Sequence, residues 1–405
     1  MKRVVITGMG VYSTIGKNIE EVNDSLYNGV SGIGIDAKRI DDGFRSPLTG
    51  IIERPILKGV LPRRMRIGLP EQGEYAYVAT MEALEMAQLD EEFRLKNEVG
   101  ILYGNDSSAV PVINAIDIVR AKKDTTLVGS GSIFQSMNSS ITMNLSVILK
   151  LTGVNFTISG ACASSSHAIG MAMILIQQGL QDIIICGGGQ EVNAESMGSF
   201  DGLSAFSTNT ADPTKASRPF DRDRDGLVPS GGAATVVVES YESAIKRGAP
   251  ILAELTGYGF SSNGEHISVP NIKGPSKSLE KALKYAGICA QDIDYVNAHA
   301  TSTIVGDTNE AQALYNIFGS KTPINSTKSM TGHEMWMCGA SEIIYSILMM
   351  QNSYIAPTIN FENPDEHSAK LNISGNRIEK NIDTFLSNSF GFGGTNSTLI
   401  VKKVK

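Results

Sequence analysis

The sequence predicts an α/β protein built around a buried, mainly parallel sheet. Short runs rich in β-branched residues alternate with longer amphipathic stretches throughout the 405 residues, which is the pattern of consecutive βαβ units. Hydrophobic residues make up 41% of the chain and charged residues 19%, so the chain can bury a large core and is not disordered. Two distant segments also open alike, each with a strand that runs into Thr-Gly-x-Gly, at Thr7 and at Thr256.

The expected strands are short, apolar and bounded by Gly or polar residues. They cover residues 4–7, 99–103, 155–159, 182–186, 251–255 and 293–298. The expected helices carry apolar side chains at helical spacing and cover residues 74–88, 163–178, 276–286 and 307–318. The repeated opening motif indicates a duplication, with one half over residues 1–250 and a second over residues 251–405. Because no Pro- or Ser-rich linker separates them, the two halves are expected to pack together.

Charge and composition disfavour several classes of protein. The chain has 35 Lys+Arg against 42 Asp+Glu and a formal net charge of -7, which argues against a general nucleic-acid binder. The apolar stretches fall short of the roughly 18 residues that a membrane span needs, and the first residues resemble a strand more than a signal peptide. The four cysteines show neither a CxxC pair nor zinc spacing. We therefore expect a cytoplasmic protein with reduced thiols, no metal and no organic cofactor.

Two motifs imitate ligand sites. Gly8-Met9-Gly10 follows a strand, as a dinucleotide-binding loop does, but Ser13 replaces the third glycine and no acidic strand end follows. A simple turn is expected there. Residues 221–226 begin like a calcium loop, yet Gly232 stands where a bidentate Glu is required. A polar turn with internal ion pairs is expected instead.

Cys162 lies at a sharp strand-to-helix turn, which is the outline of a nucleophile elbow. The strand 155–159 runs into Gly160-Ala161-Cys162, and the expected helix begins there. At this position the helix dipole would favour the thiolate, and free backbone N–H groups could face an oxyanion. A small buried cysteine with a packing role is the alternative, and it is the interpretation we give to Cys186 and Cys289.

Two of the five histidines stand where strands meet loops. His299 closes the strand 293–298, and His333 follows the strand-like residues 323–326. Ligands of α/β proteins bind at the carboxyl ends of strands. Each histidine alone could be structural, but together with an elbow cysteine they favour a shared site.

Four separated motifs resemble the β-ketoacyl-[acyl-carrier-protein] synthases, and most closely the elongating type I and II condensing enzymes. The motifs are Gly160-Ala161-Cys162-Ala163-Ser164-Ser165, His299-Ala300-Thr301-Ser302-Thr303-Ile304-Val305-Gly306-Asp307, Lys328-Ser329-Met330-Thr331-Gly332-His333 and Asn388-Ser389-Phe390-Gly391-Phe392-Gly393-Gly394-Thr395-Asn396. Their order and spacing match this family over essentially the whole chain. The resemblance implies a thiolase-like fold, a five-layer αβαβα sandwich of two similar halves, and a homodimer.

The same resemblance implies an acyltransferase that needs no cofactor. Cys162 would carry the acyl chain, and malonyl-carrier protein would condense with it by decarboxylating Claisen chemistry in fatty-acid elongation. His299 and His333 would promote the decarboxylation, and the charged pair Lys328 and Glu342 would support them.

Further residues take binding roles by the same resemblance. The backbone N–H of Phe392 would join that of Cys162 in the oxyanion hole, with Phe390 in the same gating loop. Thr301 and Thr303 would hold the pantetheine arm. An acidic carrier protein needs positive charge to dock on, and the densest basic cluster comprises Arg63, Arg64 and Arg66.

Two segments depart from the family pattern. Ala300 replaces the usual glycine after His299, and Glu334-Met335-Trp336-Met337-Cys338-Gly339-Ala340 replaces a run of small residues. The bulky Met335-Trp336-Met337 could be ordinary core packing or could reshape the pocket for an unusual acyl chain. A condensing enzyme of a polyene or polyketide pathway therefore stays open as an alternative.

Three more distant alternatives remain. A non-catalytic subunit resembling a chain-length factor would lack the cysteine at the elbow, so Cys162 argues against it. A non-decarboxylating thiolase would need a second reactive cysteine, for which Cys338 is the candidate. A nicotinamide-dependent oxidoreductase rests only on Gly8 and Gly10.

Overall fold

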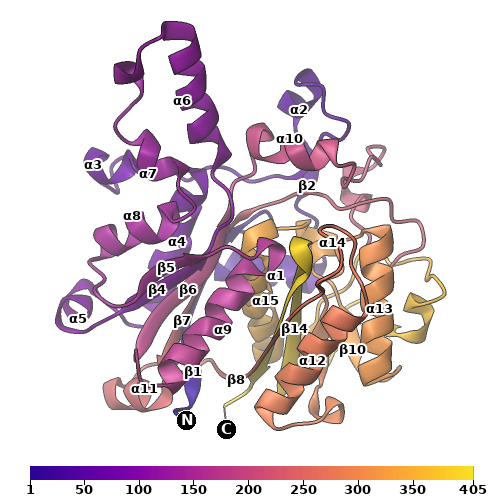
Figure 1. The fold of residues 1–405 in the computed structure, drawn as a ribbon. Coiled ribbons are helices and arrows are strands. Elements are labelled where there is room, and N and C mark those ends of the chain that lie inside the picture. The colour runs from indigo at the N-terminus through magenta and orange to yellow at the C-terminus, as the bar shows by residue number, and fades with distance from the viewer. Residues whose placement is uncertain (405) are drawn as a thin grey trace.

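The first strand of the chain lies in the middle of a continuous sheet (Figure 1). This computed structural model describes residues 1–404. Strand β1 (Val4–Ser13) pairs antiparallel with β7 (Gly232–Ser240) on one side and with β8 (Ala253–Ser262) on the other. Within the described residues the sheet has 11 strands in the order β12-β10-β9-β14-β15-β8-β1-β7-β6-β4-β5. Its other strands are β4 (Gly100–Gly104), β5 (Asn155–Ile158), β6 (Ile183–Gln190), β9 (Tyr295–Asn297), β10 (Pro323–Asn325), β12 (Asn372–Ile373), β14 (Thr384–Gly391) and β15 (Thr395–Lys402).

The strand order repeats on the two sides of the β1–β8 junction. One side reads β5-β4-β6-β7-β1 and the other reads β10-β9-β14-β15-β8. In each, the first three strands are parallel and the last two pairings are antiparallel. The sheet is thus less parallel than predicted, because β14 and β15 are joined by a tight turn, which only antiparallel neighbours allow. The division of the chain at residue 250 stays a prediction, since the sheet runs across it unbroken.

The helices lie on both faces of this sheet and between its two sides. They are α1 (Ile19–Asn28), α2 (Ala37–Asp41), α3 (Arg63–Arg66), α4 (Glu71–Met86), α5 (Glu91–Lys96), α6 (Ala109–Lys122), α7 (Ser132–Ser136), α8 (Ser140–Leu149), α9 (Ser164–Gln177), α10 (Ala194–Gly202), α11 (Tyr241–Arg247), α12 (Lys273–Ala286), α13 (Ile304–Phe318), α14 (Lys328–Thr331) and α15 (Cys338–Asn352). Small hairpins pair β2 (Ile33–Ile35) with β3 (Leu48–Gly50) and β11 (Tyr354–Ile355) with β13 (Ile378–Glu379). The predicted helices and strands are all present, with bounds shifted by a few residues and with β1 and β8 extended.

Three apolar cores separate five layers. The central core holds α9 and α15 between the two sides of the sheet, and the outer cores lie under α4 and α8 and under α12 and α13. Side chains alternate along a strand accordingly: Leu102 points to the central core, whereas Ile101 and Tyr103 point to an outer one. The same alternation separates Phe385 from Leu386. Strands covered on both faces are expected to be apolar throughout, and the predicted five-layer αβαβα sandwich is confirmed.

The repeated Thr-Gly-x-Gly motif has one physical role in both places. The register of β1 shifts at Thr7 and that of β8 shifts at Thr256, so each threonine lies in a bulge. Gly10 then lies against α4, where an added Cβ would come 2.1 Å from the carbonyl oxygen of Ala79. The matching Gly259 lies against α12, where a Cβ would come 2.0 Å from the carbonyl oxygen of Ser278. The glycines let a helix approach the sheet closely, and the turn predicted at Gly8-Met9-Gly10 is wrong, because these residues continue the strand.

The acidic segment that imitates a calcium loop is a structural turn. Asp221 is fully buried and accepts backbone hydrogen bonds from Asp223 and Asn363. It also pairs with Arg218 at 3.0 Å. Since its oxygens already have partners, the polar turn predicted here is confirmed. Among residues 1–404, no helix is both long enough and apolar enough to cross a membrane.

Candidate active site

The turn before α9 holds Cys162 in a strained backbone. Strand β5 ends at Ile158, and the 3₁₀ turn η2 (Ala161–Ala163) leads directly into α9 at Ser164. Ala161 has φ of 47°, which is unfavourable for a residue with a side chain. Its N–H donates to the carboxylate of Asp106 over 2.9 Å, and the Ser164 hydroxyl donates to its carbonyl over 2.6 Å. These contacts hold the elbow in place, with Cys162 two residues before the α-helix rather than at its first residue.

His299 and His333 are both fixed through their backbones. His299 follows β9, and its N–H donates to Glu310 of α13 over 2.9 Å. His333 follows α14 and pairs like a short strand, donating its N–H to the carbonyl of Val228 and accepting the N–H of Ser230. Both side chains are buried, at 8% and 2% exposure. Their ring positions are therefore set by the fold rather than by contacts of the rings alone.

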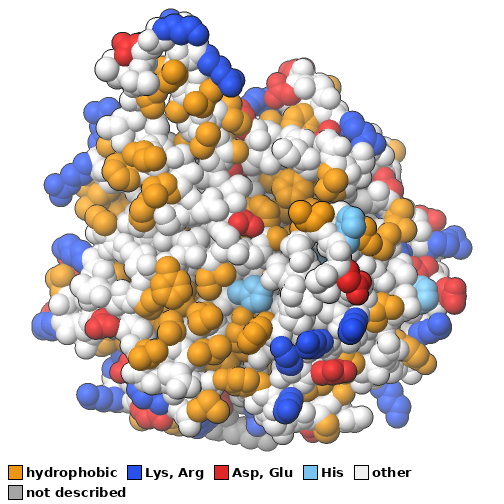
Figure 2. Space-filling view, viewed as in Figure 1, with side chains coloured by type: hydrophobic (Ala, Val, Ile, Leu, Met, Phe, Trp, Pro, Cys, Tyr) orange, Lys and Arg blue, Asp and Glu red, His pale blue; other side chains and the backbone are white. Residues whose placement is uncertain are grey.

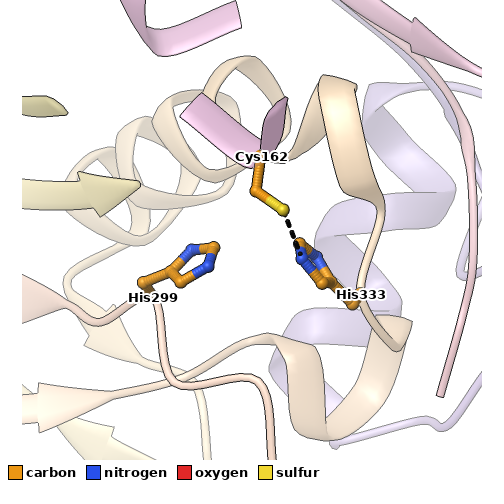
Figure 3. Close-up of side chains that lie close together, drawn as sticks. All are labelled: Cys162, His299 and His333. Carbon is orange, nitrogen blue, oxygen red and sulfur yellow. Dashed lines mark hydrogen bonds between the residues drawn. The ribbon is translucent and has the colours of Figure 1, made fainter. Parts of the chain in front are cut away.

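The cysteine and the two histidines face one another across a small gap (Figure 3). The Nε2 of His333 lies 3.0 Å from the Sγ of Cys162. The ring centroids of His299 and His333 are 5.3 Å apart, with their planes at 83°. The backbone N–H of Met335 donates to Nδ1 of His333 over 3.3 Å. Since Nδ1 accepts a hydrogen bond, the neutral ring carries its proton on Nε2, which points at the sulfur.

Burial sets the protonation of all three groups. It raises the pKa of Cys162 to about 12, although the positive charge of Lys328 and the N–H groups of Cys162 and Phe392 oppose this shift. The expectation that the thiolate is the favoured form is therefore wrong, because desolvation of the sulfur outweighs any effect of the helix terminus. Burial and the charge of Lys328 also lower the pKa of His299 and of His333 well below the usual value. Both imidazoles are neutral near pH 7 and can serve as N–H donors.

A buried ion pair supplies the positive charge behind His333. The ammonium of Lys328 contacts the carboxylate of Glu342, and each side chain is 1% exposed. Burial disfavours the charged ammonium, but the charge of Glu342 raises the pKa of Lys328 above its usual value. Lys328 thus stays protonated, and its field acts on Cys162 and on both histidines.

A cavity of about 440 Å³ opens in front of the three reactive groups. Cys162, His299 and His333 line it, and so do four other predicted residues, namely Thr301, Thr303, Phe390 and Phe392. The ring centroid of Phe390 lies 5.9 Å from that of His299. Beyond Phe392, which is 38% exposed, Gly393 and Gly394 have φ of 76° and 71°. This left-handed backbone lets the loop turn sharply back into β15.

The same three donors are the group best placed to bind a metal ion among residues 1–404. Ligand atoms of Cys162, His299 and His333 lie within 4.8 Å of one another. Zinc bound by one sulfur and two nitrogens would require bonds of about 2.0–2.3 Å, so the donors would have to close on the ion. The absence of a metal stays a prediction.

Some predicted residues lie elsewhere, and some residues at the site were missed. Arg63, Arg64 and Arg66 form the short helix α3 and do not line the cavity. The sequence reasoning missed Glu310, which holds His299, and Phe200, which lines the cavity. Glu310 left a weak signal in the sequence, since it lies three residues after Asp307 within the predicted helix 307–318. Phe200 left none, because α10 carries no motif.

The family models, relatives and solved structures that match this chain agree with one another. Residues 1–244 match the family described as "Beta-ketoacyl synthase, N-terminal domain" and residues 252–362 match "Beta-ketoacyl synthase, C-terminal domain". The chain is 42% identical to 3-oxoacyl-[acyl-carrier-protein] synthase 1 of Haemophilus influenzae, covering 100% of this chain and 99% of that protein. A crystal structure of a β-ketoacyl synthase from Burkholderia phymatum superposes with a TM-score of 0.94 at 36% identity, covering 100% of both chains.

A further solved structure includes a carrier protein. It contains a type II PKS acyl-carrier protein in complex with its ketosynthase, and it matches with a TM-score of 0.88 at 29% identity. The match covers 100% of both chains.

Proposed function

The chain belongs to the β-ketoacyl synthase family, and on that premise we propose that Cys162 carries an acyl chain that condenses with a malonyl thioester. The protein is a 3-oxoacyl-[acyl-carrier-protein] synthase of the type I/II class, an acyltransferase of fatty-acid elongation. One observation supports the residue assignment above all others. The Sγ of Cys162 lies 3.0 Å from Nε2 of His333, in a cavity that His299 also lines.

In the first half-reaction the sulfur of Cys162 attacks the carbonyl of an acyl thioester. The carrier thiol leaves and takes the proton of the cysteine, so that one thioester replaces another. Nε2–H of His333 and the charge of Lys328 stabilise the sulfur while it is negative, which a buried thiol with a raised pKa requires. The backbone N–H groups of Cys162 and Phe392 point at this region and stabilise the oxyanion.

In the second half-reaction malonyl thioester loses CO2. The carbon–carbon bond breaks and leaves its electron pair as an enolate, whose oxygen receives hydrogen bonds from the neutral rings of His299 and His333. The enolate carbon attacks the acyl carbonyl, and Cys162 leaves as a thiolate. Two neutral N–H donors suit an oxygen that becomes negative during the step, and no proton has to be given up to it.

The acyl and malonyl groups arrive on an acyl carrier protein, which we place over α3. Arg63 and Arg64 are exposed there and form no ion pair within residues 1–404. Lys122 and Lys123 are exposed at the end of α6, and Figure 2 shows Lys and Arg side chains gathered in this region at the top of the view. An acidic carrier would meet positive charge on a chain that is acidic overall. Thr301 and Thr303, with hydroxyl oxygens 3.1 Å apart, line the cavity and would bind the pantetheine amides.

A homodimer is part of the proposal. Strand β5 ends the sheet, so its outer edge has no neighbour within residues 1–404. Phe156 on this strand is 44% exposed, and Met137 beside it is 43% exposed. An unpaired edge next to apolar side chains favours pairing with a second copy. We place the enzyme in the cytoplasm, where its nucleophile stays reduced.

The non-catalytic alternative lacks support, because the cysteine, both histidines and the charged pair all converge. The polyene or polyketide alternative concerns the acyl chain rather than the chemistry, and the 334–340 segment keeps it open.

Mass spectrometry of the intact protein tests the nucleophile. The protein is incubated with carrier protein that is loaded with an acyl chain as a thioester. One acyl group is expected to be added to the wild type and none to Cys162→Ala. Digestion would then locate the group on the peptide that contains Cys162. An adduct that survives in Cys162→Ala would refute the assignment.

Release of labelled CO2 from malonyl-carrier protein tests the histidines. His299→Ala and His333→Ala are expected to lose decarboxylation by at least about a hundredfold, while acyl loading of Cys162 falls less. The opposite ranking of the two losses would overturn their proposed roles.

A further inference from the structure

The turn that begins α15 repeats the turn that begins α9. The 3₁₀ turn η5 (Met335–Met337) runs directly into α15, as η2 does into α9. Met335 has φ of 45°, close to the 47° of Ala161. The second residue of η2 is Cys162, and the second residue of η5 is Trp336. In the second half of the fold, Trp336 therefore takes the position that the nucleophile takes in the first.

Trp336 is packed tightly beside the nucleophile. It is 7% exposed and belongs to the same apolar cluster as Cys162. Its ring centroid lies 6.2 Å from that of Phe200, and its Nε1–H donates to Ser107 over 3.4 Å. On its other side the turn meets β6, where a Cβ on Gly188 would lie 2.6 Å from the carbonyl oxygen of Trp336. The turn cannot withdraw toward the sheet to make space.

The cavity is lined by both polar and apolar side chains. Asn271, Thr301 and Thr303 are among the polar ones, and Phe200, Leu227 and Met335 are among the apolar ones. An acyl chain on Cys162 is apolar and a pantetheine arm carries amides, so the acyl chain belongs among the apolar side chains. Within residues 1–404, the residues that line the cavity include Phe200 and Met335 but not Trp336. The indole packs against Phe200 from outside the cavity lining.

We propose that Trp336 limits the length of the acyl chain that Cys162 can carry, so that this enzyme accepts short acyl chains and rejects long ones. The proposal rests on the function proposed above. Phe200 is the side chain through which the limit acts, because its ring also lies 6.3 Å from that of Phe206 and 6.2 Å from that of Phe392. A long chain would have to displace Phe200 into Trp336, and a packed core resists such displacement.

Rates of acylation across a series of chain lengths test the limit. Acetyl-, butanoyl-, octanoyl-, dodecanoyl- and hexadecanoyl-carrier protein are offered to each variant, and acyl-Cys162 is measured by intact mass. In the wild type the hexadecanoyl rate is expected to lie at least about tenfold below the butanoyl rate. Trp336→Ala and the milder Trp336→Leu are expected to raise the hexadecanoyl rate by about tenfold and to leave the butanoyl rate within about threefold.

Two matched variants control for other effects. Trp336→Phe keeps an aromatic ring in the turn and is expected to keep the wild-type preference for short chains. Phe385→Ala opens space in the central core on β14 and is expected to lower the melting temperature without changing the preference.

Each remaining outcome has one meaning. Equal acylation by all chain lengths in the wild type, or an unchanged preference in both Trp336→Ala and Trp336→Leu, would overturn the proposed limit. If no acyl chain of any length is transferred to the wild type, the proposed function is wrong. This result differs from a failure of the chain-length limit alone, in which acyl transfer to Cys162 would still be observed.

Discussion

The two sides of the sheet share one strand order, yet the turns that follow β5 and β10 carry different groups. The first turn is short: it passes through η2 into α9 and presents one sulfur. The second is longer: it passes through α14, His333 and η5 before α15 begins. The two central helices start side by side, since a Cβ on Gly339 of α15 would lie 2.6 Å from the side chain of Ser166 on α9. Both turns therefore open into the same cavity.

The difference between the turns is mainly one of charge. The first turn presents an uncharged thiol, and its strain is held by Asp106 and Ser164. The second carries Lys328, whose ammonium forms a buried ion pair with Glu342 of α15. A duplicated fold can thus place a nucleophile in one half of the chain and the charge that acts on it in the other half. The comparison teaches that the second half supplies a positive charge that opposes the effect of burial on the pKa of Cys162, and each prediction below tests part of this division.

Removing the charge of the second turn is expected to have the largest effect. Lys328→Met leaves Glu342 buried without its partner, which costs about 3–5 kcal/mol of unfolding free energy. The cost is expected to be smaller at low pH, where Glu342 can take up a proton. Urea unfolding measures the loss, and CO2 release from malonyl-carrier protein is expected to fall with it.

The double variant Lys328→Met with Glu342→Gln separates stability from chemistry. It removes both charges, so most of the lost stability is expected to return. Decarboxylation is expected to stay low, because the field on the histidines is still missing. Recovery of full activity in the double variant would contradict the proposed role of the charge.

The close contact between sheet and helix that the two halves share can be tested at two matched glycines. In Gly10→Ala and Gly259→Ala the new Cβ would meet a helix carbonyl at 2.1 Å and 2.0 Å, and we expect each to cost about 3 kcal/mol by overpacking. Gly202→Ala at the end of α10 is the control, because nothing lies within 4 Å of its Cβ position. Unfolding midpoints in urea compare the three variants. Similar losses of unfolding free energy at Gly10 and Gly259 would support equivalent packing in the two halves. A large loss at only one of them would contradict it.

Much of this arrangement could be predicted from the sequence. The Thr-Gly-x-Gly repeat pointed to two similar halves, because the motif encodes a bulge and a close helix contact in each. The position of His299 at a strand end predicted that it would lie near Cys162, since ligands of α/β proteins bind at the carboxyl ends of strands. His333 was expected at a strand end too, but α14 lies between it and β10.

Other features depend on tertiary contacts that no local pattern contains. The raised pKa of Cys162 arises from burial by segments distant in sequence, and a helix-terminus argument considers only the residues beside it. The strand conformation of Gly8 and Gly10 was missed because a glycine pair is typical of turns, and only the approach of α4 explains it. Glu310 was missed because its partner, the N–H of His299, lies on another element.

The smallest expected effect concerns how the second half holds His299. Burial raises the pKa of Glu310 to about 7 from its usual 4.5, although the N–H of His299 and the amide of Asn388 oppose the shift. The folded protein thus binds this proton more tightly than the unfolded chain, and its contribution to stability falls as pH rises from about 4.5 to about 7. Glu310→Gln has no proton to lose, so its unfolding free energy is expected to fall less steeply than that of the wild type over this interval, by up to about 3 kcal/mol in total. Urea unfolding at a series of pH values measures both slopes, which should become parallel above pH 8. Identical slopes between about 4.5 and 7 would show that Glu310 is already ionised in the folded protein and holds His299 as a carboxylate.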